Sequence, residues 1–142
     1  MLSDDHSTEV IITTYSHSIN SNSAYSYLIR KDKGQEILES KILTDCDTPG
    51  KAELIAILTA LRTLSAPSLV LLFPYHTSYL SQEFSNLENG IRHLNKPNVA
   101  DIFDELSRLF KYHDVLIEYS KDVRPETELL KDVTLATLKE IV

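Results

Sequence analysis

One helix, expected to begin at Thr48, constrains the fold of this chain more than any other segment. Thr48 can cap the helix, and Pro49 suits its first position because the N–H that proline lacks has no helical partner there. The residues that follow place an apolar stripe at helical spacing, formed by Leu54, Ile57, Leu58, Leu61 and Leu64. Glu53 lies at the head of this stripe and not on a solvated side. The simplest explanation is a first-turn acid that interacts with the positive end of the helix dipole.

Three strand-like segments precede this helix. Residues 9–15 are rich in β-branched side chains, residues 24–30 are rich in aromatic side chains, and residues 36–43 follow as a third strand. Residues 16–23 are rich in Ser and Asn and are expected to form a loop. Gly34 supplies a turn position at which a positive φ is favourable. The segments together predict an antiparallel meander.

The chain after the helix alternates between helices and strands. Pro67 is expected to break the chain, and the continuous apolar run at residues 68–73 predicts a strand buried on both faces. The remaining patterns predict a helix at residues 78–89, a stronger helix capped by Asn98, a strand at residues 115–119 and a terminal helix from Pro125 to about Ile141. This order predicts an α/β fold of three layers, in which a mixed sheet of three antiparallel and two further strands carries helices on both faces.

Length and composition limit the classes of protein to which the chain can belong. Its 142 residues fit one domain spanning 1–142, in which residues 1–7 are expected to form a flexible tail. The net charge of -7 and the lack of a basic cluster disfavour binding to nucleic acid. Cys46 is the only cysteine, which favours a reducing compartment and a cytoplasmic location. No apolar run approaches the length of a membrane span, so no membrane association is expected.

Three short patches, together with the order of elements, point to a known family. Residues 51–54 (Lys-Ala-Glu-Leu) open an alanine-containing apolar helix, residues 78–80 (Ser-Tyr-Leu) follow the buried strand, and Lys131 and Asp132 lie in the last helix. From Glu9 to the C-terminus, the chain resembles the ribonuclease H-like superfamily in order and spacing. The resemblance implies the three-layer fold of that superfamily.

The resemblance also implies a site at the end of the central strands. In the family, four carboxylates hold two Mg²⁺ ions about 4 Å apart, and these ions activate a water and stabilise the leaving oxygen. Glu53 matches the second acid and Asp132 the fourth, whereas the position of the first acid falls on Thr14. The third position falls on Tyr75 or His76, between which the sequence does not decide.

The accessory residues of the family are also absent, since its flexible histidine would lie near Val123. The chain is thus identified as a divergent member that lacks two of the four active-site acids. Two carboxylates can hold at most one Mg²⁺ weakly, so Glu53 and Asp132 are the only candidate metal ligands. No cofactor is expected, and Mg²⁺ or Mn²⁺ would serve any residual activity.

Two other roles remain open for the retained acids. In the first, further nitrogen and oxygen ligands complete a Mn²⁺ or Zn²⁺ site beside Glu53 and Asp132. The candidates are His17, His76, Asp122 and either Asp45 or Asp47. Alternatively, Glu53 and Asp132 are structural groups that accept hydrogen bonds from backbone N–H groups at the strand ends. The missing acids favour the structural role.

These observations support one main functional hypothesis and two alternatives. The main hypothesis is a catalytically degenerate ribonuclease H-like domain that serves as a structural or protein-interaction module, within an assembly that processes nucleic acid. The first alternative is a divergent metal-dependent nuclease or nucleic-acid-binding protein that uses Glu53 and Asp132 with non-standard ligands. The second is a coincidence of fold with a small-molecule or regulatory role.

The expected partner is another protein. The candidate contacts are the exposed edge of the meander and a set of tyrosines, because tyrosine combines a large apolar area with a polar tip: Tyr15, Tyr25, Tyr27, Tyr75 and Tyr79. Tyr75 is the strongest of these candidates, since its side chain could plug the place of the third acid.

Overall fold

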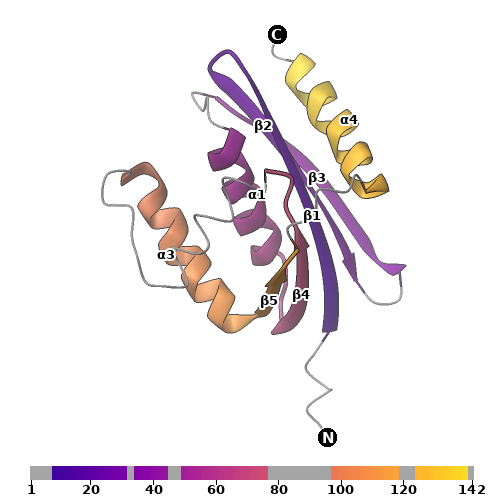
Figure 1. The fold of residues 1–142 in the computed structure, drawn as a ribbon, viewed down its shortest axis with the longest axis vertical. Coiled ribbons are helices and arrows are strands. Elements are labelled where there is room, and N and C mark those ends of the chain that lie inside the picture. Colours follow the sequence, from indigo (N-terminus) through magenta and orange to yellow (C-terminus); the bar gives the residue numbers. More distant parts are fainter. Residues whose placement is uncertain (1–7, 32–33, 45–48, 77–96, 119–123, 141–142) are drawn as a thin grey trace, which may run out of the picture.

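The computed structural model describes residues 8–31, 34–44, 49–76, 97–118 and 124–140 (Figure 1). Five strands and three helices lie within these ranges: β1 (Thr8–Ile19), β2 (Asn22–Lys31), β3 (Glu36–Leu43), α1 (Pro49–Arg62), β4 (Ser68–Phe73), α3 (Pro97–Tyr112), β5 (Asp114–Ile117) and α4 (Pro125–Lys139). The helix expected at residues 78–89 falls outside the described residues.

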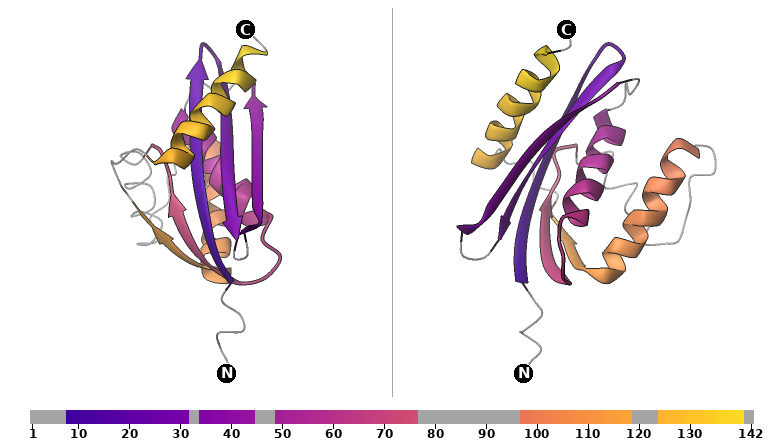
Figure 2. Two further views of the ribbon diagram at one scale, coloured as in Figure 1. Left: turned by 90° about the vertical axis from the view of Figure 1, so that its right-hand side faces the viewer. Right: turned by 180° about the vertical axis from the view of Figure 1, so that it is seen from behind.

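The five strands form one mixed sheet in the order β3-β2-β1-β4-β5. β1, β2 and β3 pair antiparallel, whereas β4 pairs parallel with both β1 and β5. Helices α1 and α3 cover one face of the sheet and α4 crosses the other face (Figure 2). The prediction of an α/β fold with a mixed five-stranded sheet and helices on both faces is confirmed.

The hairpin between β1 and β2 differs from the sequence prediction. Residues 16–23 were expected to form a loop, but the two strands run on to Ile19 and start again at Asn22. Asn20 makes the tight turn with a φ of 59°, a conformation that asparagine tolerates better than most residues. The hydroxyls of Ser18 and Ser23 hydrogen-bond each other across the hairpin, with their Oγ atoms 2.5 Å apart. The expected turn at Gly34 is present, with a φ of 80°.

The main core lies between the sheet and α1. Ile12 of β1, Ile57 of α1 and Leu72 of β4 are fully buried there. β4 was expected to be buried on both faces, but only Ser68, Val70 and Leu72 are buried, and the residues between them are half-buried. The reason is that α4 packs against β1, β2 and β3 and leaves the second face of β4 partly open.

Smaller differences concern the ends of the elements. α3 begins at Pro97, so Asn98 lies inside the first turn and is not the cap. β5 ends at Ile117 and α4 at Lys139, each two residues before the expected end. None of the described helices has the length and apolar character needed to cross a membrane.

α4 is attached to the sheet by both apolar and polar contacts. Leu130 packs with Tyr15 of β1 and Leu28 of β2 in a small buried cluster. One turn further on, the hydroxyls of Thr134 and Ser26 lie 2.6 Å apart and are buried. Hydroxyl pairs thus contribute to the attachment of α4, whereas α1 is attached to the opposite face of the sheet mainly by apolar contacts.

Candidate functional site

The candidate site is the carboxylate of Glu53, which lies at the end of the central strands and is fully buried. Thr14 donates a hydrogen bond from Oγ1 to Oε2 over 2.7 Å, and Ser16 donates from Oγ to Oε1 over 3.4 Å. The backbone N–H groups of Tyr75 and His76 donate to Oε2 and Oε1, respectively, the latter over 3.1 Å. Each carboxylate oxygen therefore accepts one hydroxyl and one backbone N–H.

Three segments bring these donors together. Thr14 and Ser16 are two residues apart in β1, so their side chains point to the same face of the sheet, on which α1 lies. β4 runs parallel to β1 and ends at Phe73, and the chain then turns so that two successive N–H groups point at the carboxylate. Ser16 was missed as a partner of Glu53, although its two-residue spacing from Thr14 was visible in the sequence.

The first turn of α1 contains no acidic residue, and Glu53 lies in the second turn. The expectation that Glu53 is a first-turn acid at the positive end of the helix dipole is therefore wrong. Its partners belong to β1 and to the segment after β4, so the carboxylate connects three parts of the fold.

Burial and hydrogen bonding act in opposite directions on Glu53. Burial raises the pKa of Glu53 to about 7, and the hydrogen bonds from Thr14, Tyr75, His76 and Ser16 limit this rise. The backbone N–H donors cannot reverse, whereas a hydroxyl can turn to accept a hydrogen bond from a neutral carboxyl group. The site therefore tolerates both protonation states near neutral pH.

His76 lies beside the carboxylate, within the distance of an ion pair when its imidazole is protonated. Its Nε2 is 3.8 Å from Oε1 of Glu53 and 3.1 Å from the carbonyl oxygen of Ser16. Burial lowers the pKa of His76, and the hydrogen bond to Ser16 raises it by less. A carbonyl oxygen can only accept, so Nε2 carries a hydrogen and donates it to Ser16, and the lowered pKa of His76 disfavours the charged imidazole that an ion pair with Glu53 would need.

The structure brings together some of the residues named from the sequence. Thr14, Tyr75 and His76 each donate a hydrogen bond to Glu53, and both Tyr75 and His76 lie in the segment that follows β4. Asp132 is exposed on α4. Since Leu130 and Thr134 on either side of Asp132 face the sheet, its side chain points away from the sheet.

Among the other candidate ligands, His17 is the one that the structure describes, and it is not a hydrogen-bond partner of Glu53. His17 is half-buried in β1, where it pairs with Ala24 of β2. Val123, Asp122, Asp45 and Asp47 lie outside the described residues. Among the described residues, no group of three or more His, Cys, Asp or Glu side chains could hold a metal ion.

The described residues at Glu53 do not fit a two-metal centre. A divalent cation needs free oxygen lone pairs and convergent negative charge. The two Glu53 oxygens already accept four hydrogens, and the N–H groups of Tyr75 and His76 present partial positive charge on this side of the carboxylate. Thr14 is neutral and adds no second charge. Glu53 is a buried acceptor of four hydrogen bonds from described residues.

The structure separates the candidate contact tyrosines into two groups. Tyr15, Tyr25 and Tyr27 are buried, each only 3% exposed, so the prediction that they are contacts for a partner is wrong. They instead belong to the two apolar cores of the domain. Tyr75 is 46% exposed and packs against Tyr15 with ring centroids 4.5 Å apart and the ring planes tilted by 55°. Its backbone, and not its side chain, fills the place beside Glu53. Tyr79 lies outside the described residues.

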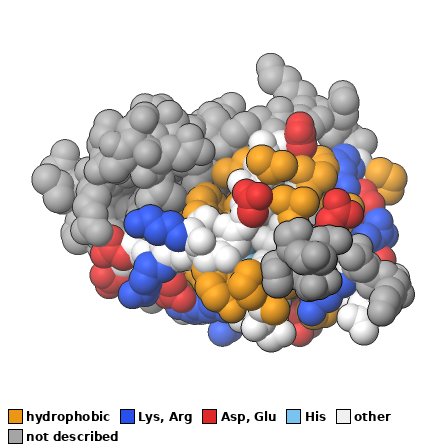
Figure 3. Space-filling view, turned by 90° about the horizontal axis from the view of Figure 1, so that it is seen from below, with side chains coloured by type: hydrophobic (Ala, Val, Ile, Leu, Met, Phe, Trp, Pro, Cys, Tyr) orange, Lys and Arg blue, Asp and Glu red, His pale blue; other side chains and the backbone are white. Residues whose placement is uncertain are grey.

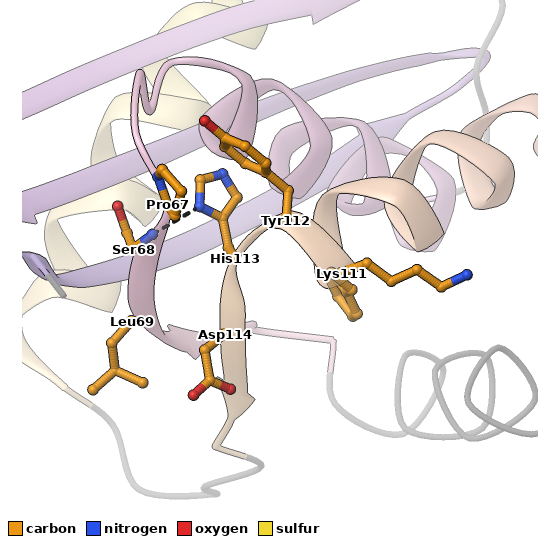
Figure 4. Close-up of a pocket in the computed structure, with 8 residues that line it drawn as sticks. Pro67, Ser68, Leu69, Lys111, Tyr112, His113 and Asp114 are labelled. Carbon is orange, nitrogen blue, oxygen red and sulfur yellow. Dashed lines mark hydrogen bonds between the residues drawn. The ribbon is translucent and has the colours of Figure 1, made fainter. Parts of the chain in front are cut away.

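Two pockets that are lined by described residues lie away from Glu53. One, of about 480 Å³, lies between the start of β4 and the junction of α3 with β5 (Figure 4). Nδ1 of the buried His113 accepts the N–H of Ser68 there over 3.1 Å, and burial lowers the pKa of His113. The other, of about 430 Å³, lies on the open part of the sheet and includes Ile11, Leu71 and Leu116. Neither pocket is lined by Glu53 or its hydrogen-bond partners.

Comparison with known proteins identifies the fold. No family model matches the sequence, and no curated protein matches it. The chain is similar in structure to LC9-RNase H1, with a TM-score of 0.73 and 8% identity over 96% of this chain and 74% of the other.

Two further solved structures give the same result. RNase H1 from Halobacterium salinarum has a TM-score of 0.68 and 14% identity, covering 93% of this chain and 98% of the other. The N-terminal RNase H domain of rv2228c from Mycobacterium tuberculosis has a TM-score of 0.68 and 14% identity, covering 96% and 100%. The chain therefore has the ribonuclease H-like fold over almost its whole length.

Proposed function

We propose that this chain is a catalytically inactive ribonuclease H-like domain that serves as a structural or protein-interaction module in an assembly that processes nucleic acid. The observation that carries the proposal is the saturation of the Glu53 carboxylate by four hydrogen-bond donors. An acid used this way links α1, β1 and the end of β4, and its lone pairs are not free for a cation. The retained glutamate then has a structural role.

The charge of the chain supports a protein partner over direct binding to nucleic acid. The net charge is -7, and strong binding to a phosphate backbone would need a local basic patch. On the face seen in Figure 3, the visible lysine and arginine side chains are interspersed with acidic ones and form no continuous basic patch. Together with a single cysteine, this favours a protein-binding role in the cytoplasm.

The proposal predicts that the protein does not cleave an RNA–DNA hybrid. A labelled hybrid is incubated with the purified protein in Mg²⁺ and then in Mn²⁺, and products are followed by gel electrophoresis. We expect no cleavage in either metal, because the described residues at Glu53 supply a single carboxylate whose oxygens are already hydrogen-bonded.

The matched control is the double variant Glu53→Gln, Asp132→Asn, purified in the same way to account for contaminating nucleases. Cleavage by the native chain that disappears in the double variant would overturn the proposal. It would establish the alternative, a divergent metal-dependent nuclease in which Glu53 and Asp132 act with ligands from other parts of the chain.

A further inference from the structure

The strand β3 forms one edge of the sheet, and no described strand lies on its outer side. It is eight residues long, and in the left view of Figure 2 no helix lies in front of it. The strand at the other edge, β5, has only four residues. An edge strand presents a row of unpaired backbone N–H and C=O groups to which another strand can bind. β3 is therefore the edge better suited to accept a further strand.

The side chains of β3 alternate between the two faces of the sheet. Ser40 hydrogen-bonds Thr137 of α4 over 2.7 Å, so the even-numbered residues Leu38 and Ile42 also lie on the α4 face. The odd-numbered residues Glu39 and Lys41 lie on the opposite face and are exposed. Neither forms an ion pair with another described residue. Leu38 is 43% exposed, so its apolar surface is available to a strand that pairs with this edge.

We propose that β3 pairs antiparallel with β3 of a second copy of this chain, about a two-fold axis at Ser40, so that the two sheets join into one. In this register, Glu39 of each copy lies opposite Lys41 of the other, which forms two cross-strand ion pairs. On the α4 face, Leu38 of each copy lies opposite Ile42 of the other. The strand is complementary to itself in both charge and apolar character.

Neighbouring registers lack this complementarity. Directly opposite residues in antiparallel strands point to the same face, so the axis must pass through a residue and not between two residues. An axis at Glu39 would place the two Glu39 carboxylates opposite each other, and an axis at Lys41 would do the same with two ammonium groups. Like charges directly opposite each other destabilise a strand pair. Only the axis at Ser40 places unlike charges together.

This inference goes beyond the proposed function and does not depend on it. None of the residues in the β3 edge hydrogen-bonds Glu53. The domain could dimerise through β3 whether or not it cleaves nucleic acid.

Sedimentation equilibrium of the full chain over a wide concentration range tests the inference. Wild type is compared with Glu39→Lys, with Lys41→Glu and with the double variant that exchanges the two charges. We expect a reversible dimer for wild type and for the double variant. In each single variant, two like-charge pairs replace two ion pairs, so we expect association about tenfold weaker or worse. Both substituted residues are exposed, and circular dichroism checks that each variant is folded.

The variant Asp114→Lys serves as a matched control, because it makes the same change of charge on an exposed residue of β5, the opposite edge strand. We expect it to dimerise like wild type. A monomeric wild type at every concentration would overturn the inference. Single variants that associate as tightly as wild type, or a double variant that fails to recover, would overturn it equally, because the proposed register requires Glu39 to face Lys41.

Discussion

The variant Glu53→Ala is expected to destabilise the fold by about 3 to 5 kcal/mol. The substitution leaves a cavity at a fully buried position and removes the acceptor of four hydrogen bonds. The backbone N–H groups of Tyr75 and His76 would lose the acceptor that they share and cannot find another by rotating. Urea unfolding followed by circular dichroism measures the loss.

Two milder variants calibrate this effect. Thr14→Val keeps the size of the side chain but removes one donor to Oε2, so we expect a loss of about 1 kcal/mol. Glu53→Gln keeps the size but turns an NH₂ group toward one backbone N–H, so we expect a loss of about 1 to 3 kcal/mol. If Glu53→Ala is within about 1 kcal/mol of wild type, Glu53 is not a structural acceptor.

Ionisation of Glu53 should make the free energy of unfolding depend on pH, because burial raises the pKa of Glu53 from 4.5 to about 7. The full change in the free energy of unfolding is about 3 kcal/mol. A folded-state pKa above the unfolded value means that folding favours the protonated carboxyl. The contribution is fully present below pH 4.5 and is lost as the pH rises from 4.5 through 7. We therefore expect Glu53 to make folding less favourable at pH 8 than at pH 5.

The variant Glu53→Gln isolates this effect because glutamine does not titrate. The lowered pKa values of His76 and His113 act in the opposite direction, since their contribution is lost as the pH falls, but they are common to both proteins. The free energy of unfolding of wild type relative to Glu53→Gln should fall by about 2 to 3 kcal/mol between pH 5 and pH 8. A difference that does not change with pH would show that Glu53 keeps an ordinary carboxyl pKa in the folded protein.

The fold could be predicted from the sequence because its apolar patterns have clear periods. The helical stripe of α1 and the apolar run of β4 each allow one interpretation, and their order limits the topology to a few arrangements. The β1–β2 hairpin could not be predicted in full. Its serines and asparagines are typical of loops, and only the cross-strand contact of Ser18 with Ser23 shows how they are accommodated in strands.

The candidate site was predictable only in part. The resemblance placed Thr14, Glu53 and the segment after β4 in one region, and the structure shows them in contact. The backbone N–H donors depend on how the chain turns after Pro74, which side-chain patterns do not encode. The exposure of individual tyrosines could not be predicted from the sequence either, because an amphipathic side chain such as that of Tyr25 suits a core and a surface equally well.

The most direct test of the central claim, that Glu53 is a hydrogen-bonded structural acceptor and not a metal ligand, is an NMR titration with Mn²⁺. Bound Mn²⁺ broadens amide signals close to it. We predict that the amide signals of Tyr75 and His76 broaden no more than those near exposed acids such as Asp132, because their N–H groups already occupy the carboxylate. Selective broadening of these two signals at low Mn²⁺ concentration, abolished in Glu53→Gln, would contradict the claim.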